Sequence, residues 1–361
     1  MQSAIQNVNE LVKTVATLEG KKKDLVVDTS IIQMHKTADG DQIEIPNYGR
    51  FSIEEHAQGQ IASRLNIPKR FYDILPQKSE MARVNLVNTL WNDAPEKRLL
   101  RCLTGNDTVR AYLSNSFRCY DNLEVLSAVM PTLKNLYKEG IKFTVKGSGL
   151  TSRKMYLQII FDSMTTEVVE GDVVSYGVTL TNSEVGAGAW DLSETVWRLI
   201  CQNGMVGNSL VRKTHVGSKL SEGDGVADYF KEDTVKADIQ LQAKKVRDVF
   251  EHAVNTGNER LEGMVSPLRT ASEIVLPDQK IEVAEEVTKR FSFTDDENGK
   301  LIEQIIKGDD LSGDKFTGWD LINGVTSLAH FSSDLDRQHY FENVGSKIAK
   351  FTENEWGDLL N

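Results

Sequence analysis

The spacing of apolar residues changes along the chain and predicts an α+β body followed by helices. Apolar residues recur every three or four positions in four segments, as is typical of amphipathic helices: 4–18, 53–65, 77–91 and 121–138. Other runs are rich in β-branched residues and alternate between apolar and polar positions, as the strands of a largely antiparallel sheet require. These runs are 24–35, 41–46, 141–147, 154–162, 166–172 and 173–182.

A β-hairpin is predicted over 97–114, because Gly105-Asn106-Asp107 lies at its centre. With the turn centred on Asn106, one face holds the core residues Leu99, Leu103, Val109, Ala111 and Leu113. The other face is then basic and aromatic, of the kind that contacts a phosphate backbone and stacks a base; it carries Arg98, Arg110 and Tyr112. A slip of one residue would exchange the two faces, and Arg101 already falls on the apolar side.

The last third of the chain has a helical pattern. Its apolar spacing predicts one long helix over 230–256 and further helices over 279–290, 300–307, 318–331 and 337–351. The stretch 263–278 contains two prolines and is predicted to be a linker. We therefore expect two domains, an α+β body over 1–225 with a central antiparallel sheet and an acidic helical region over 226–361.

Composition limits the class of protein. The chain has 361 residues, 40% of them hydrophobic, which is enough for one large core or two smaller ones. It contains no run of about 18 apolar residues that could span a membrane, and its N-terminal residues lack the pattern of a secretory signal. These features predict a cytoplasmic protein without a membrane partner.

Motifs for catalysis, metals and cofactors are weak. Cys102, Cys119 and Cys201 lie far apart, so that neither disulfides nor a zinc site is indicated. Near matches to dinucleotide, phosphate and calcium loops each lack a required residue, and we expect neither a metal nor a cofactor. Cys201 and His215 could act as nucleophile and base, but a buried structural cysteine is the favoured interpretation, and no catalytic residue is assigned.

The net charge of −11 is unevenly distributed. Residues 1–250 hold 31 Lys and Arg against 31 Asp and Glu, whereas 251–361 hold 11 against 22. A neutral body with basic clusters can still offer the positive potential that phosphate contacts need, although such clusters are also common on ordinary solvated surfaces. The residues that we predict to contact nucleic acid are Arg98, Arg110, Tyr112, Arg118, Arg212, Lys213, His215 and Lys219.

A distinctive motif lies within 179–217, where two Asn/Gly-rich turns flank a short apolar run. Its residues are Asn182, Ser183, Gly186, Arg198, Cys201, Asn203 and Gly204, followed by His215. With supporting segments at 54–75, 109–126 and 318–330, this signature resembles the phage- and plasmid-like family known as domain of unknown function 932. The resemblance implies a mobile genetic element in a bacterial host cell and implies no particular biochemistry.

Two functions stay open at this point. The first is binding of single-stranded DNA or RNA on a basic and aromatic sheet face, as an accessory of annealing or recombination; phage annealing proteins also combine an antiparallel sheet with an adjacent helix. The second is a non-enzymatic contact with a host protein, in host takeover or antidefence, through the acidic helical region. A homo-oligomer is expected. The segment 353–360 is expected to dock on a basic partner, to compete with nucleic acid for the cationic patch of the body, or to pack on the core through Trp356 and Leu359.

Overall fold

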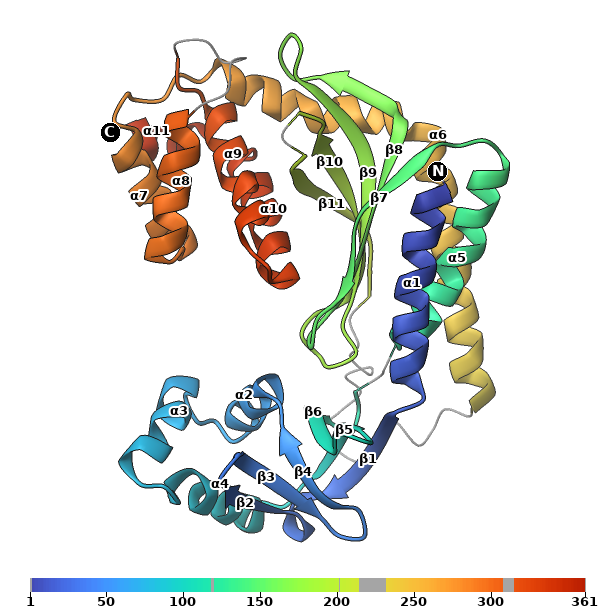
Figure 1. Ribbon diagram of the computed structural model, residues 1–361, viewed down its shortest axis with the longest axis vertical. Coiled ribbons are helices and arrows are strands. Elements are labelled where there is room, and N and C mark those ends of the chain that lie inside the picture. The colour runs from blue at the N-terminus through green and yellow to red at the C-terminus, as the bar shows by residue number, and fades with distance from the viewer. Residues whose placement is uncertain (1, 118–119, 201, 214–231, 308–314, 361) are drawn as a thin grey trace.

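The structure is a computed structural model that describes residues 2–117, 120–200, 202–213, 232–307 and 315–360. It confirms the α+β class, with two mainly antiparallel sheets and a helical C-terminal part. The two sheets lie in different lobes, and together they give the molecule the outline of a letter C (Figure 1).

The first sheet has the strand order β1-β5-β6-β4-β3-β2. Its strands are β1 (Lys22–Asp28), β2 (Gln33–Thr37), β3 (Gly40–Ile45), β4 (Gly49–Ile53), β5 (Lys97–Leu103) and β6 (Thr108–Ser114). Only the β4–β6 pair is parallel among these strands. The sheet shares a hydrophobic core with α2 (Glu55–Arg64), α3 (Lys69–Lys78) and α4 (Ala82–Asp93). We call this unit, residues 22–114, the N-terminal lobe.

The second sheet is antiparallel throughout, with the order β11-β10-β9-β8-β7. Its strands are β7 (Phe143–Leu150), β8 (Met155–Glu167), β9 (Val173–Asn182), β10 (Trp190–Arg198) and β11 (Gly204–Lys213). Because paired residues on neighbouring strands share a face, the register defines an apolar row of Leu157, Leu180, Leu192 and Val211. Three helices cover this apolar face: α1 (Gln2–Glu19), α5 (Asn122–Lys138) and α6 (Glu232–Glu273) (Figure 1).

The opposite face of the second sheet is polar. Its register places Tyr156, Thr181, Asp191 and Arg212 in one row across four strands. This face looks toward the C-terminal helices, since the Tyr156 hydroxyl donates to Asp336 of α10 over 2.6 Å. These helices are α7 (Lys280–Phe291), α8 (Asp295–Lys307), α9 (Gly318–Ser327), α10 (Leu335–Ile348) and α11 (Glu353–Leu360). The inner wall of the C is therefore polar.

One hydrophobic core joins α1, α5, the second sheet and the C-terminal helices, whereas the N-terminal lobe has a core of its own. The acidic end of the chain belongs to the larger core, because Trp356 and Leu359 of α11 are buried. Residue 225, the predicted domain boundary, lies outside the described residues, and the division at that point stays a prediction.

The predicted linker over 263–278 is wrong for most of its length. Residues 263–273 continue α6, and Val265, Leu268 and Ala271 extend its buried apolar stripe. Pro267 lies inside the helix, where it removes one N–H donor. The burial of three apolar side chains outweighs that cost, which a rule based on proline alone does not weigh.

The run 166–172 is not a separate strand. β8 continues to Glu167, and a turn follows in which the Val168 N–H donates to the Asp172 carbonyl and the Asp172 N–H donates to the Val169 carbonyl. The β-branched composition of this run predicted extended structure, but the turn lets β8 pair directly with β9.

Candidate functional site

The prediction that the β5–β6 hairpin exposes a basic and aromatic face is wrong. Arg98, Arg110 and Tyr112 are all buried, with exposures of 7%, 8% and 0%. A bulge at Arg110 also separates them, because Arg101 pairs with Ala111 while Cys102 pairs with Val109. Tyr112 and Arg98 therefore lie toward α4, with the guanidinium 5.7 Å from the Tyr112 ring centre, and Arg110 points to the other side.

Arg110 and Arg101 both bind the loop that joins β9 to β10. Both Nη groups of Arg110 donate to Glu184 Oε2, over 3.2 and 3.3 Å, and Arg101 Nη1 donates to the Glu184 carbonyl over 2.9 Å. Arg101 also pairs with Asp24 and Asp121. These cations are therefore neutralised inside the molecule and offer no contact to a phosphate.

The first half of the family motif forms this same loop. Asn182 donates to the Tyr120 carbonyl and to Asn122 Oδ1, each over 2.8 Å. The Ser183 hydroxyl donates to the Arg153 carbonyl and accepts from the Ala187 N–H. Gly186 has φ of +76°, a conformation that favours glycine. The motif residues thus fix the path of residues 182–187, which we call the junction loop.

Glu184 is the centre of the junction loop. Its carboxylate is 4% exposed and binds Lys22, Arg110 and the Asn122 N–H. Burial alone would raise the pKa of this carboxyl, but the two cations and the N–H donor hold that pKa below its ordinary value. Because Lys22 and Arg110 belong to the N-terminal lobe, Glu184 connects that lobe to the second sheet.

Helix α2 also contacts the junction loop. Gln60 donates to the Val185 carbonyl over 2.7 Å, and His56 Nε2 lies 3.0 Å from the same oxygen. Burial lowers the pKa of His56 against the effect of this hydrogen bond. His56 is therefore neutral at pH 7 and acts as a donor to the loop.

The second half of the motif also supports packing. Arg198 forms a buried ion pair with Asp172, with Nε 2.7 Å from Oδ1, and the Trp319 indole donates to the same carboxylate over 2.8 Å. Asn203 binds Thr326 of α9. A side chain at Gly204 would meet the Trp197 ring at 2.9 Å. These residues attach the β10–β11 end of the sheet to α9.

Several predicted residues cannot be placed. Arg118, Cys201, His215 and Lys219 lie outside the described residues. Lys213 ends β11, where its backbone pairs with Trp190. Arg212, the residue before it, is exposed. Of the predicted contact residues, Arg212 is therefore the one whose side chain the structure places at the surface.

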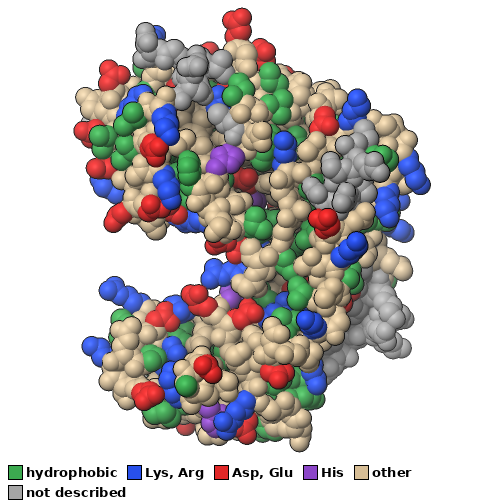
Figure 2. All heavy atoms as spheres, viewed as in Figure 1, with side chains coloured by type: hydrophobic (Ala, Val, Ile, Leu, Met, Phe, Trp, Pro, Cys, Tyr) green, Lys and Arg blue, Asp and Glu red, His purple; other side chains and the backbone are tan. Residues whose placement is uncertain are grey.

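An open cleft separates the N-terminal lobe from the C-terminal helices (Figure 2). Helices α2 and α3 form its wall on the side of the N-terminal lobe (Figure 1). The two helices carry the exposed residues Arg64, Lys69, Arg70 and Phe71, with Phe71 at 53% exposure. Lys69 pairs with Asp73, whereas neither Arg64 nor Arg70 forms an ion pair within the described part of the chain.

The sequence-based prediction missed this cleft wall, although its signal was present. Pro68 precedes α3, and Lys69, Arg70 and Phe71 follow at once, with no acidic residue in the first helical turn. The positive end of the helix dipole therefore adds to two cations. The far side of the cleft is different, because α8 begins with Asp295, Asp296 and Glu297.

Metal and thiol chemistry find no support in the described residues. No group of three or more His, Cys, Asp or Glu side chains among them could hold a metal ion. Cys102 is buried, and desolvation raises the pKa of its thiol to about 12, so that its thiolate form is negligible at neutral pH.

Comparison with protein families identifies the chain. The model of the family described as "Domain of unknown function (DUF932)" matches residues 111–333, well over half of the sequence, and the protein belongs to this family. Neither the curated proteins nor the solved structures contain a match. No described helix is both long and apolar enough to span a membrane.

Proposed function

We propose that the protein binds single-stranded nucleic acid in the cleft, as a cytoplasmic accessory of annealing or recombination encoded by a mobile element. The observation that carries this proposal is the exposed set of Arg64, Arg70 and Phe71 on the α2–α3 wall. Two arginines that have no carboxylate partner among the described residues supply the local positive potential that phosphates require, and an exposed aromatic ring can stack a base.

Charge on the two walls favours one orientation of the strand. At the start of α8, Asp296 and Glu297 pair with Lys300 and Arg337, and Asp295 adds negative charge without a cationic partner among the described residues. On α2 and α3, Arg64 and Arg70 add positive charge that attracts phosphates. The polar row of the second sheet, ending in exposed Arg212, forms the inner wall between them. We therefore propose that the phosphate backbone follows α2 and α3 toward Arg212, with the bases directed into the cleft.

Fluorescence anisotropy with a labelled oligothymidylate tests the proposal. At low salt the full chain is expected to bind with micromolar or weaker affinity, and the double variant Arg64→Glu/Arg70→Glu should lose about tenfold or more, because two charge-assisted contacts are reversed. Arg50→Glu/Arg247→Glu is the matched control, since these arginines are exposed and lie on β4 and α6.

The control variant is expected to bind like the wild type. If the wild type does not bind at low salt, or if both double variants weaken binding equally, the cleft proposal is wrong. The alternative would then be a contact between a host protein and the acidic C-terminal helices.

A further inference from the structure

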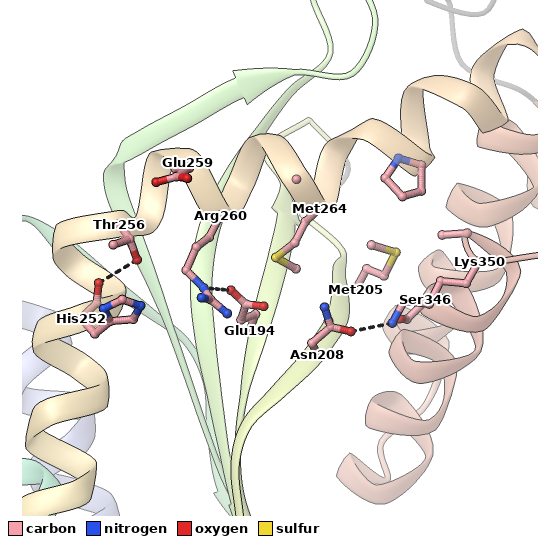
Figure 3. A pocket seen from close by; sticks show the side chains of 14 residues that line it. Glu194, Met205, Asn208, His252, Thr256, Glu259, Arg260, Met264, Ser346 and Lys350 are labelled. Atoms are coloured by element: carbon pink, nitrogen blue, oxygen red, sulfur yellow. Dashed lines mark hydrogen bonds and ion pairs between the residues drawn. The ribbon is translucent and has the colours of Figure 1, made fainter.

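A pocket of about 540 Å³ lies at the β11 edge of the second sheet, between α6 and the C-terminal end of α10 (Figure 3). The cleft reaches α10 near its other end, where Asp336 binds Tyr156. The pocket is therefore separate from the proposed strand site. Its volume falls within the range of pockets that hold small organic ligands.

The polar end of the pocket is built around a buried carboxylate. The Glu194 side chain is 2% exposed, and Oε1 accepts from both the Tyr176 hydroxyl and Arg260 Nε. Oε2 accepts from no described residue and points away from Arg260, toward the side lined by Asn208 and Met205 (Figure 3). A buried carboxylate oxygen in this position can accept a hydrogen bond from a ligand N–H.

Arg260 supplies donors next to this acceptor. Its Nε is used by Glu194, and 31% of its side chain is exposed in the pocket lining. The terminal Nη groups can therefore donate to a ligand oxygen beside the N–H that Glu194 accepts. The ion pair between Arg260 and Glu194 has no net charge. An uncharged ligand group can therefore bind to it without leaving a buried charge unpaired.

The remaining walls suit a planar ring with a polar substituent. Met264 from α6 and Met205 from β11 line the pocket from different elements, and thioethers make favourable contacts with aromatic rings (Figure 3). At the α10 side, Lys350 Nζ lies 2.9 Å from Asn208 Oδ1. An ammonium group at this position can bind a phosphate.

We propose that this pocket binds a nucleotide whose base presents a ring N–H beside a carbonyl oxygen, as guanine and uracil do. The carbonyl oxygen accepts from one terminal Nη group of Arg260, while the neighbouring ring N–H donates to Glu194 Oε2. Adenine and cytosine carry an amine where this oxygen stands, and the amine would oppose the guanidinium donors. The site is independent of the cleft and goes beyond strand binding.

Isothermal titration of the full chain with the 5′-monophosphates of guanosine, uridine, adenosine and cytidine tests the proposal. The guanosine or uridine nucleotide should bind at least about tenfold more tightly than the other two. Glu194→Gln should remove most of this preference, because the amide turns a donor toward the ligand N–H. Glu251→Gln, at an exposed position on α6, is the matched control and should bind like the wild type.

A second variant tests the pocket independently, in case Glu194→Gln impairs folding. Met264→Ala removes one wall of the pocket and should weaken all four nucleotides while leaving the ion pair in place. The proposal is overturned if no mononucleotide binds at millimolar concentration, or if the four bind equally and Glu194→Gln changes nothing. Mononucleotide binding should also persist in Arg64→Glu/Arg70→Glu, which separates this site from the cleft.

Discussion

Within the N-terminal lobe, the arginines of the β5–β6 hairpin and the arginines of helices α2 and α3 lie in opposite environments. In the β5–β6 hairpin, Arg98, Arg101 and Arg110 are almost completely buried, and Arg110 and Arg101 bind the junction loop. On α2 and α3, Arg64 and Arg70 are exposed and have no carboxylate partner among the described residues. Arg101 and Arg110 stabilise the contact between the lobe and the second sheet, whereas Arg64 and Arg70 are accessible to a ligand.

The difference lies in the distribution of carboxylates. Glu184, Asp121 and Asp24 pair with Arg101 and Arg110, and Glu184 and Asp24 come from segments that are distant in sequence from the hairpin. A basic strand therefore indicates a surface only when no acidic segment folds onto it. Charged residues buried in this way are costly to leave without a partner, which makes the comparison testable by removing one partner at a time.

The largest effect is expected at the junction loop. Glu184→Ala leaves Arg110 buried without its carboxylate and removes one of the carboxylates that bind Lys22, and it should reduce the free energy of unfolding by about 3–5 kcal/mol. Glu44→Ala removes a carboxylate that is 46% exposed and pairs with Arg50, and it should cost about 0–1 kcal/mol. Urea unfolding of both variants measures the difference. Equal losses would show that Glu184 is no more important than a surface ion pair.

A smaller effect is expected at Gly186. A Cβ there would lie 2.8 Å from Leu113 Cδ2, and φ of +76° is unfavourable for alanine. Gly186→Ala should therefore cost about 1–3 kcal/mol. Gly263→Ala on α6, where a Cβ would meet no atom within 4 Å, is the control and should be neutral or stabilising. A neutral Gly186→Ala variant would mean that the loop adapts.

The smallest effect concerns pH. Burial lowers the pKa of His56 in the folded protein below its ordinary value of 6.5, so the unfolded chain takes up the proton first. Stability is therefore fully present above pH 6.5 and falls below it, by at most about 1.4 kcal/mol for each unit of pH. His56→Gln should lose less stability than the wild type between pH 7.5 and 5.5. An unchanged pH dependence in urea unfolding would contradict this role.

Much of the fold could be predicted from periodicity. The helix expected over 121–138 is α5 (Asn122–Lys138), and the strand expected over 173–182 is β9. These segments have long regular patterns with clear end signals. The helix expected over 230–256 extends much further, to Glu273, because tertiary burial continues past Pro267.

The candidate sites were less predictable, because contacts between distant segments decide them. Tyr112 looked like a stacking residue, but α4 covers it, with Trp91 6.1 Å from its ring centre. Glu194 and Arg260 lie 66 positions apart, and no local pattern relates them. By contrast, Phe71 follows two cations directly and could have been recognised as a surface feature from the sequence.

The salt dependence of oligonucleotide binding tests the central claim most directly, that the unpaired cleft arginines are the ones that meet phosphates. For the wild type, the logarithm of the association constant should fall linearly with the logarithm of salt concentration, by about 0.7 for each phosphate contact. Arg64→Ala/Arg70→Ala should lower this slope by about 1.4 and leave the free energy of unfolding within about 1 kcal/mol of the wild type. An unchanged slope in this variant would contradict the account.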